Sequence, residues 1–106
     1  MHLVQLLLPT RDNTGKPFPA TVTAQTRVEL VEQFGGVTAY LRSAAAGAWI
    51  NDDGVLERDE VVMVEVLVEQ FDPNWWREYA GRLAERFGQE EMHIRAMAVT
   101  LITTPA

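Results

Sequence analysis

Hydrophobic and polar positions alternate most regularly between Glu60 and Gln70, where a valine stands at every second position from 62 to 68. A period of two predicts a strand with one buried face. A shorter apolar run from His2 to Leu8, closed by Pro9, predicts a second strand that is mostly buried. Two weaker extended segments are expected at 37–50 and 92–102.

A helix is predicted between Thr21 and Phe34, because apolar residues recur there at intervals of three and four. Gly35-Gly36 is expected to end this helix. The predicted buried stripe consists of Ala24, Val28, Val31 and Phe34.

A second helix is predicted to begin at Asp72-Pro73, which combines an N-cap acceptor with proline at the first helical position. Gly88 is expected to end it. Its predicted buried stripe consists of Trp76, Tyr79, Ala80, Leu83 and Phe87.

The resulting order is strand, helix, strand, strand, helix, strand. At 106 residues, with 47% hydrophobic residues, the chain is expected to form one domain spanning residues 1–106. The order predicts an α+β, ferredoxin-like βαββαβ sandwich, with two helices on one face of a four-stranded antiparallel sheet.

The net charge of −6 comes from residues 51–72, which hold eight acidic residues and one basic residue. Asp53-Gly54 is a strong hairpin signal, and a hairpin centred there would place Trp49 opposite Arg58 in a cation–π contact. A calcium loop is disfavoured, because aligning Gly54 with the conserved loop glycine puts Trp49 at a ligand position. The acidic residues are therefore interpreted as a solvated hairpin tip.

Several classes of function are disfavoured by composition. The chain has no cysteine and two separated histidines, so no metal and no cofactor are predicted. Because no basic stripe is present, no nucleic-acid partner is expected. The apolar runs are too short to span a membrane, and the first residues lack signal-peptide features, so a cytoplasmic location is expected.

Several short motifs carry a resemblance to a known group of proteins: Phe34-Gly-Gly-Val-Thr38, Gly47-Ala-Trp49, Gly54-Val-Leu56, Glu60 and Arg86-Phe-Gly-Gln-Glu90. Over roughly residues 28–95 the chain resembles a small bacterial domain family of unknown function. The resemblance implies a ferredoxin-like fold, and it implies no activity or catalytic residue. Turn chemistry does not explain Trp49 and Glu60, and we expect Glu60 to lie opposite Gly47 and to hydrogen-bond backbone.

The sheet face that the helices leave uncovered is predicted to be unusually apolar, with large side chains from three strands. Burial against a second copy would remove this surface from water, so a homodimer through the sheet face is predicted. The polar residues expected on or near this face are Gln5, Tyr40, Arg42, Glu65, His93 and Arg95.

Two interpretations of these polar residues stay open. They could form a small-molecule site, with an arginine binding an anion and Glu65 or His93 acting as acid or base. Alternatively, Glu65 forms an ion pair with an arginine, and His93 lies at a wet rim. A hairpin without slippage would place Arg42 opposite Glu65, and a bulge at 43–47 would shift this pairing by one residue.

The leading functional prediction is a homodimeric domain that binds a small molecule or a protein partner across its sheet face. The alternative is a cofactor-independent oxygenase or isomerase of the dimeric α/β-barrel type. A purely structural interaction module is the third possibility.

Overall fold

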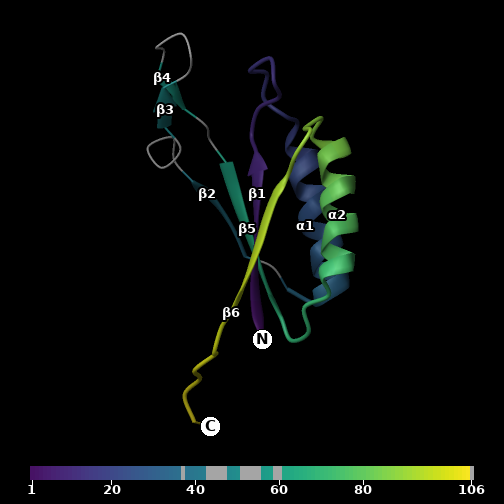
Figure 1. Cartoon of the computed structure of the whole chain (residues 1–106), viewed down its shortest axis with the longest axis vertical. Helices are drawn as coiled ribbons and strands as arrows, with labels where there is room; N and C mark the ends of the chain where they lie inside the picture. The colour runs from purple at the N-terminus through teal and green to yellow at the C-terminus, as the bar shows by residue number, and fades with distance from the viewer. Residues whose placement is uncertain (37, 43–47, 51–55, 59–60, 106) are drawn as a thin grey trace.

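The computed structural model describes residues 1–36, 38–42, 48–50, 56–58 and 61–105. For 38–42, 48–50 and 56–58 it describes the backbone alone. Figure 1 shows the elements, which follow one another along the chain as β1 (His2–Pro9), α1 (Ala20–Phe34), β2 (Thr38–Arg42), β3 (Ala48–Ile50), β4 (Leu56–Arg58), β5 (Val61–Val68), α2 (Pro73–Arg86) and β6 (His93–Ala98).

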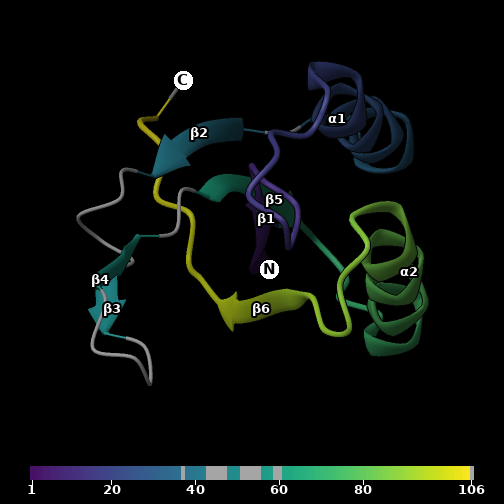
Figure 2. The same ribbon diagram turned by 90° about the horizontal axis from the view of Figure 1, so that it is seen from above.

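Four strands form one antiparallel sheet in the order β2-β5-β1-β6. The short strands β3 and β4 pair with each other in a separate ribbon. Figure 2 shows both helices on the same side of the sheet. The α+β class predicted from the sequence is therefore confirmed.

The hydrophobic core lies between this sheet and the helices. Alternate residues of the two central strands point into it and are buried: Val4, Leu6 and Leu8 from β1, and Val64, Val66 and Val68 from β5. The predicted alternation of β5 is confirmed, and its period of two explains why the intervening residues lie on the other face of the sheet. We call that other face the open face.

The predicted buried stripe of α1 is wrong in part. Val28 and Val31 are 55% and 44% exposed, whereas Thr26 and Leu30 are fully buried. Thr26 can occupy a core position because its hydroxyl donates to the Val22 carbonyl at 3.1 Å and accepts from Arg86 at 2.9 Å. A buried polar group that is hydrogen-bonded avoids most of the desolvation cost.

The same arginine joins the two helices. Arg86 on α2 donates from Nη1 and Nη2 to the two carboxylate oxygens of Glu29 on α1, at 2.7 and 2.8 Å. The hydrogen bonds from Arg86 are the main cause that lowers the pKa of Glu29. The Tyr79 hydroxyl also donates to Glu29, at 2.9 Å, and burial is the main cause that raises the pKa of this phenol.

Helix α2 begins as predicted. The Asp72 carboxylate accepts from the backbone N–H of Asn74 at 3.0 Å and of Trp75 at 3.4 Å, and Pro73 is the first helical residue. The predicted stripe is buried at four positions, Trp76, Tyr79, Leu83 and Phe87, and half-buried at Ala80.

The last strand is shorter than predicted. β6 stops at Ala98, which lies opposite His2, and one further backbone hydrogen bond joins Val99 N to Met1 O at 3.0 Å. Residues 99–105 have strand-like composition but form no regular secondary structure.

The hairpin register also differs by one residue from the prediction. Trp49 lies opposite Glu57, and Arg58 lies opposite Ala48, so the predicted pairing of Trp49 with Arg58 is wrong. The expected turn at 53–54 and the expected pairing of Gly47 with Glu60 fall outside the described residues.

Candidate functional site

A row of three polar side chains crosses the open face at mid-height. Gln5 on β1 lies between Glu65 on β5 and Arg95 on β6 in the strand register. Gln5 Nε2 donates to Glu65 Oε2 at 2.7 Å, and Arg95 Nε donates to Gln5 Oε1 at 2.8 Å. We call Arg95, Gln5 and Glu65 the polar row.

The chemistry of its two ends fixes the orientation of the Gln5 amide. A carboxylate can only accept and a guanidinium can only donate, so the NH₂ group must point to Glu65 and the oxygen to Arg95. Within the part of the chain that the structure describes, neither charged residue forms an ion pair, and the two Nη groups of Arg95 make no hydrogen bond. The row therefore keeps one positive and one negative end.

Apolar residues flank the polar row on one side. Leu3 lies between Leu67 and Met97 in the register, and these two outer side chains are each 41% exposed. Exposure of large side chains here agrees with the predicted apolar surface. Met63, which lies on the same face of β5, is 1% exposed and is therefore buried.

On the other side of the polar row, His93 on β6 lies opposite Leu7 on β1. Tyr40 and Arg42 lie on β2, opposite Met63 and Val61. The predicted pairing of Arg42 with Glu65 is therefore wrong, since the residue opposite Glu65 is Thr38. Three of the six predicted site residues contact one another through Gln5, and His93 lies one step farther along the same strand as Arg95.

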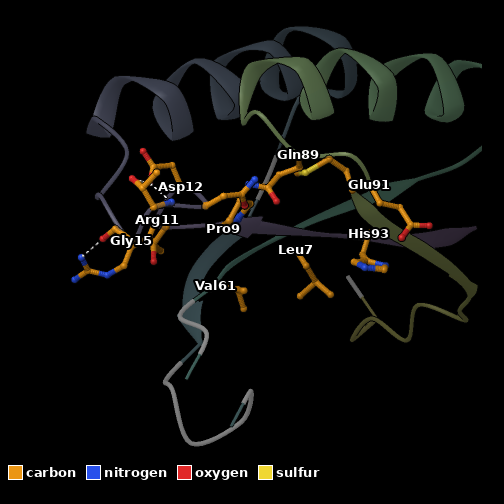
Figure 3. Close-up of a pocket in the computed structure, with 13 residues that line it drawn as sticks. Leu7, Pro9, Arg11, Asp12, Gly15, Val61, Gln89, Glu91 and His93 are labelled. Carbon is orange, nitrogen blue, oxygen red and sulfur yellow. Dashed lines mark hydrogen bonds between the residues drawn. The ribbon is translucent and has the colours of Figure 1, made fainter. Parts of the chain in front are cut away.

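A pocket of about 750 Å³ opens at the His93 end of the open face. Figure 3 shows Leu7, Val61 and His93 from the strands on one side of it, with Arg11 and Asp12 from the β1–α1 loop on another. Gln89, Glu91 and Met92, which connect α2 to β6, complete the wall. The lining is therefore part apolar and part polar, as in many small-molecule sites.

The β1–α1 loop that forms one wall of the pocket is held by its own hydrogen bonds. Asp12 Oδ1 accepts from the Thr14 hydroxyl at 2.6 Å and from the backbone N–H of Thr14 and Lys16, each at 2.9 Å. These bonds, chiefly that from the Thr14 hydroxyl, lower the pKa of Asp12. Phe18 fixes the end of the loop by an edge contact with the core ring of Phe87, with ring centroids 5.2 Å apart.

Sequence reasoning missed this wall of the pocket. None of the six predicted site residues lies in the β1–α1 loop or in the segment between α2 and β6. What brings them together is the antiparallel pairing of β6 with β1, which places the start of one strand beside the end of the other. The sequence did offer one signal. In the predicted fold, the loop after the first strand and the loop before the last strand lie at the same end of the sheet.

A second, smaller groove of about 370 Å³ lies between α2 and β6 and is lined mainly by apolar residues, among them Phe71, Trp76 and Ile94. Among the described residues, no three His, Asp or Glu side chains are arranged to hold a metal ion. In the same part of the chain, no helix is long and apolar enough to cross a membrane.

Comparisons with known proteins bear on the fold. No family model and no curated protein matches the chain. Among solved structures, the chain is similar to a phage SAM lyase in complex with S-methyl-5'-thioadenosine, with a TM-score of 0.63 and 10% identity. The similarity covers 91% of this chain and 79% of that one. At this identity the likeness shows a shared fold, and the resemblance to a small bacterial family stays a prediction.

Proposed function

We propose that this chain is a ferredoxin-like domain that acts as a homodimer and binds a small molecule in the pocket beside His93. The observation that carries the proposal is the pocket itself. Its volume of about 750 Å³ lies within the range of roughly 300–1,000 Å³ typical of ligand sites. It also joins an apolar floor to hydrogen-bonding groups from two loops.

The chemistry of the lining indicates an amphipathic ligand. Leu7, Val61 and Met92 offer apolar contact, whereas Arg11 and His93 offer hydrogen-bond donors and Glu91 offers an acceptor. A heterocycle bearing hydroxyl groups would satisfy both kinds of wall. S-methyl-5'-thioadenosine, which the structurally similar phage lyase binds, has this character and is a rational first ligand to test.

The homodimer is supported by the exposed leucine and methionine side chains on the open face. Because Leu67 and Met97 flank Leu3 in one row, they form a continuous apolar strip. We expect light scattering to give the mass of a dimer at micromolar concentration. Leu67→Glu, which places a charge in the strip, should give a folded monomer.

The binding test is a thermal-shift screen of metabolites that includes S-methyl-5'-thioadenosine and SAM, followed by calorimetric titration of compounds that raise Tm. His93→Ala should weaken binding at least about tenfold, the effect of losing one good polar contact. Arg77→Ala, an exposed change on α2 outside this pocket, is the matched control. No Tm change across a broad panel, with the dimer intact, would instead favour a structural interaction module.

A second candidate function is catalysis in the same pocket. His93 and Glu91 both line it and could transfer protons, and the structural neighbour is a lyase. The oxygenase or isomerase of the dimeric α/β-barrel type would use the same groups. Incubation with SAM, followed by chromatography for S-methyl-5'-thioadenosine, tests lyase activity directly. If the chain binds a ligand but shows no turnover that depends on His93, the result favours a binding function without catalysis.

A further inference from the structure

We infer that the second copy of this chain packs on the open face about a two-fold axis parallel to β1, so that Arg95 of each copy meets Glu65 of the other. The inference rests on the homodimer of the proposed function and adds its orientation. It commits to a second copy because the open face is complementary to itself in charge.

The order of charges in the polar row selects the orientation. Across the sheet the row reads positive at Arg95, neutral at Gln5 and negative at Glu65. When two sheets face each other, a two-fold axis along β1 reverses the row, and opposite charges then meet. An axis along the row itself would keep the order and set Arg95 against Arg95, which like-charge repulsion disfavours.

The hydrogen-bond chemistry of the row agrees with this arrangement. Arg95 donates its Nε–H to Gln5, and its two Nη groups make no hydrogen bond with any described residue. A guanidinium binds a carboxylate well through such a pair of donors. A charge enclosed in an interface without a partner would be costly, so the row requires a partner bearing an acid opposite Arg95.

The same axis also matches the apolar strip to itself. It sets Leu3 opposite Leu3 of the second copy, and Leu67 opposite Met97 of the second copy. Both outer side chains, each 41% exposed in the single chain, then become covered. An axis along the polar row would instead set the apolar strip opposite the row that contains Leu7 and His93. Apolar side chains of the strip would then face the polar side chain of His93.

Apolar side chains beyond the sheet support a partner on this side. Figure 2 shows the β3–β4 ribbon and the segment after β6 on the side of the sheet away from the helices. In that segment Leu101 and Ile102 are 58% and 90% exposed, so apolar side chains extend where a second copy would lie.

Charge reversal tests the orientation. Arg95→Glu makes both ends of the row acidic, and Glu65→Arg makes both ends basic, so each variant alone should dimerise roughly 100-fold more weakly than the wild type. When the two variants are mixed, every facing pair is again of opposite sign. The mixture should therefore form a heterodimer, detectable by sedimentation with one chain fluorescently labelled.

Mixing separates this mechanism from simple damage to the fold, because the hydrogen-bonded row within each chain stays altered in the mixture. Arg77→Glu, a reversal on the exposed surface of α2, is the control that should leave the dimer unchanged. Single variants that dimerise like the wild type, or a mixture that stays monomeric, would overturn the orientation. A monomeric wild type would overturn the homodimer as well, whereas ligand binding in the pocket is measured independently.

A cross-linking test reads the geometry directly, since the chain has no cysteine of its own. When Leu67→Cys and Met97→Cys chains are mixed, the two cysteines meet across the inferred axis, whereas each variant alone sets its cysteine opposite an unchanged residue. Because facing sheets pack about 10 Å apart, too far for a direct disulfide, a bismaleimide linker of about that length is used. The mixture should give a covalent dimer, and neither single variant should do so efficiently. A mixture that remains dimeric without cross-linking would refute the axis.

Discussion

Replacing Arg86 by methionine should destabilise the protein by about 3 kcal/mol, because the change removes three hydrogen bonds that join α1 to α2. Arg86 binds both Glu29 oxygens and the Thr26 hydroxyl at 2.7–2.9 Å, and its side chain is 15% exposed. Hydrogen bonds to charged groups contribute about 1.5–3 kcal/mol each, and part of this is offset by desolvation. A loss of about 3 kcal/mol corresponds to a Tm lower by roughly 12 °C for a domain of this size.

The pH dependence identifies Glu29 as the partner. Its pKa is lowered in the folded state, so its contribution is fully present above the ordinary value of 4.5 and is lost as the pH falls through the folded pKa. The stability difference between wild type and Arg86→Met should therefore be largest near pH 7 and shrink below about pH 4.5. Urea unfolding followed by tryptophan fluorescence at pH 3 to 8 measures it.

Two further variants make the measurement specific. Arg77→Met removes the same charge from an exposed position on α2 and should change stability by less than about 0.5 kcal/mol. Glu29→Gln should match the wild type in acid and fall below it at neutral pH. The reasoning is refuted if Arg86→Met is no more destabilised than Arg77→Met, or if its deficit is the same at pH 3 and pH 7.

Three other predictions follow from backbone and loop geometry. Gly81→Ala should raise the unfolding free energy by about 0.5–1 kcal/mol in a urea titration, because no atom lies within 4 Å of the added Cβ in an exposed helical position. Gly35→Ala should lower it by roughly 1 kcal/mol, since Gly35 caps α1 at a φ of 83°, whereas Gly36→Ala should be near neutral. Asp12→Ala should leave Tm nearly unchanged but speed hydrogen exchange at the backbone amides of Thr14 and Lys16, because the loop loses the three hydrogen bonds that Asp12 accepts. Unchanged exchange at these amides would show that other contacts hold the loop.

Pattern alone could predict the elements whose local and tertiary preferences agree. The valines of β5 and the Asp72-Pro73 start of α2 fall into this class, because alternation and capping depend on neighbours in the sequence. The burial of α1 could not be predicted in this way. Thr26 is buried because Arg86, 60 residues later, hydrogen-bonds its hydroxyl, and valine at position 28 faces water instead.

The candidate site shows the same division. Alternation placed Gln5, Glu65 and Arg95 on one face, and the register brought them into contact. It could not place Arg42, because the prediction assumed one continuous hairpin register, whereas the register of β2 against β5 differs from that of β3 against β4. The pocket depends on two loops that meet only after β6 has paired with β1.

The two faces of β1 differ in what covers them and in the side chains that they carry. Apolar residues on both faces of a central strand are expected where both faces are covered, and the helices cover one. If the open face were apolar throughout, many dimer orientations would have similar energies. Gln5 with its two charged neighbours adds little stability once desolvation is counted, but it strongly disfavours orientations that oppose like charges. An axis along β1 also sets the pockets of both copies at the same end of the dimer, so each pocket borders the partner's pocket across the axis.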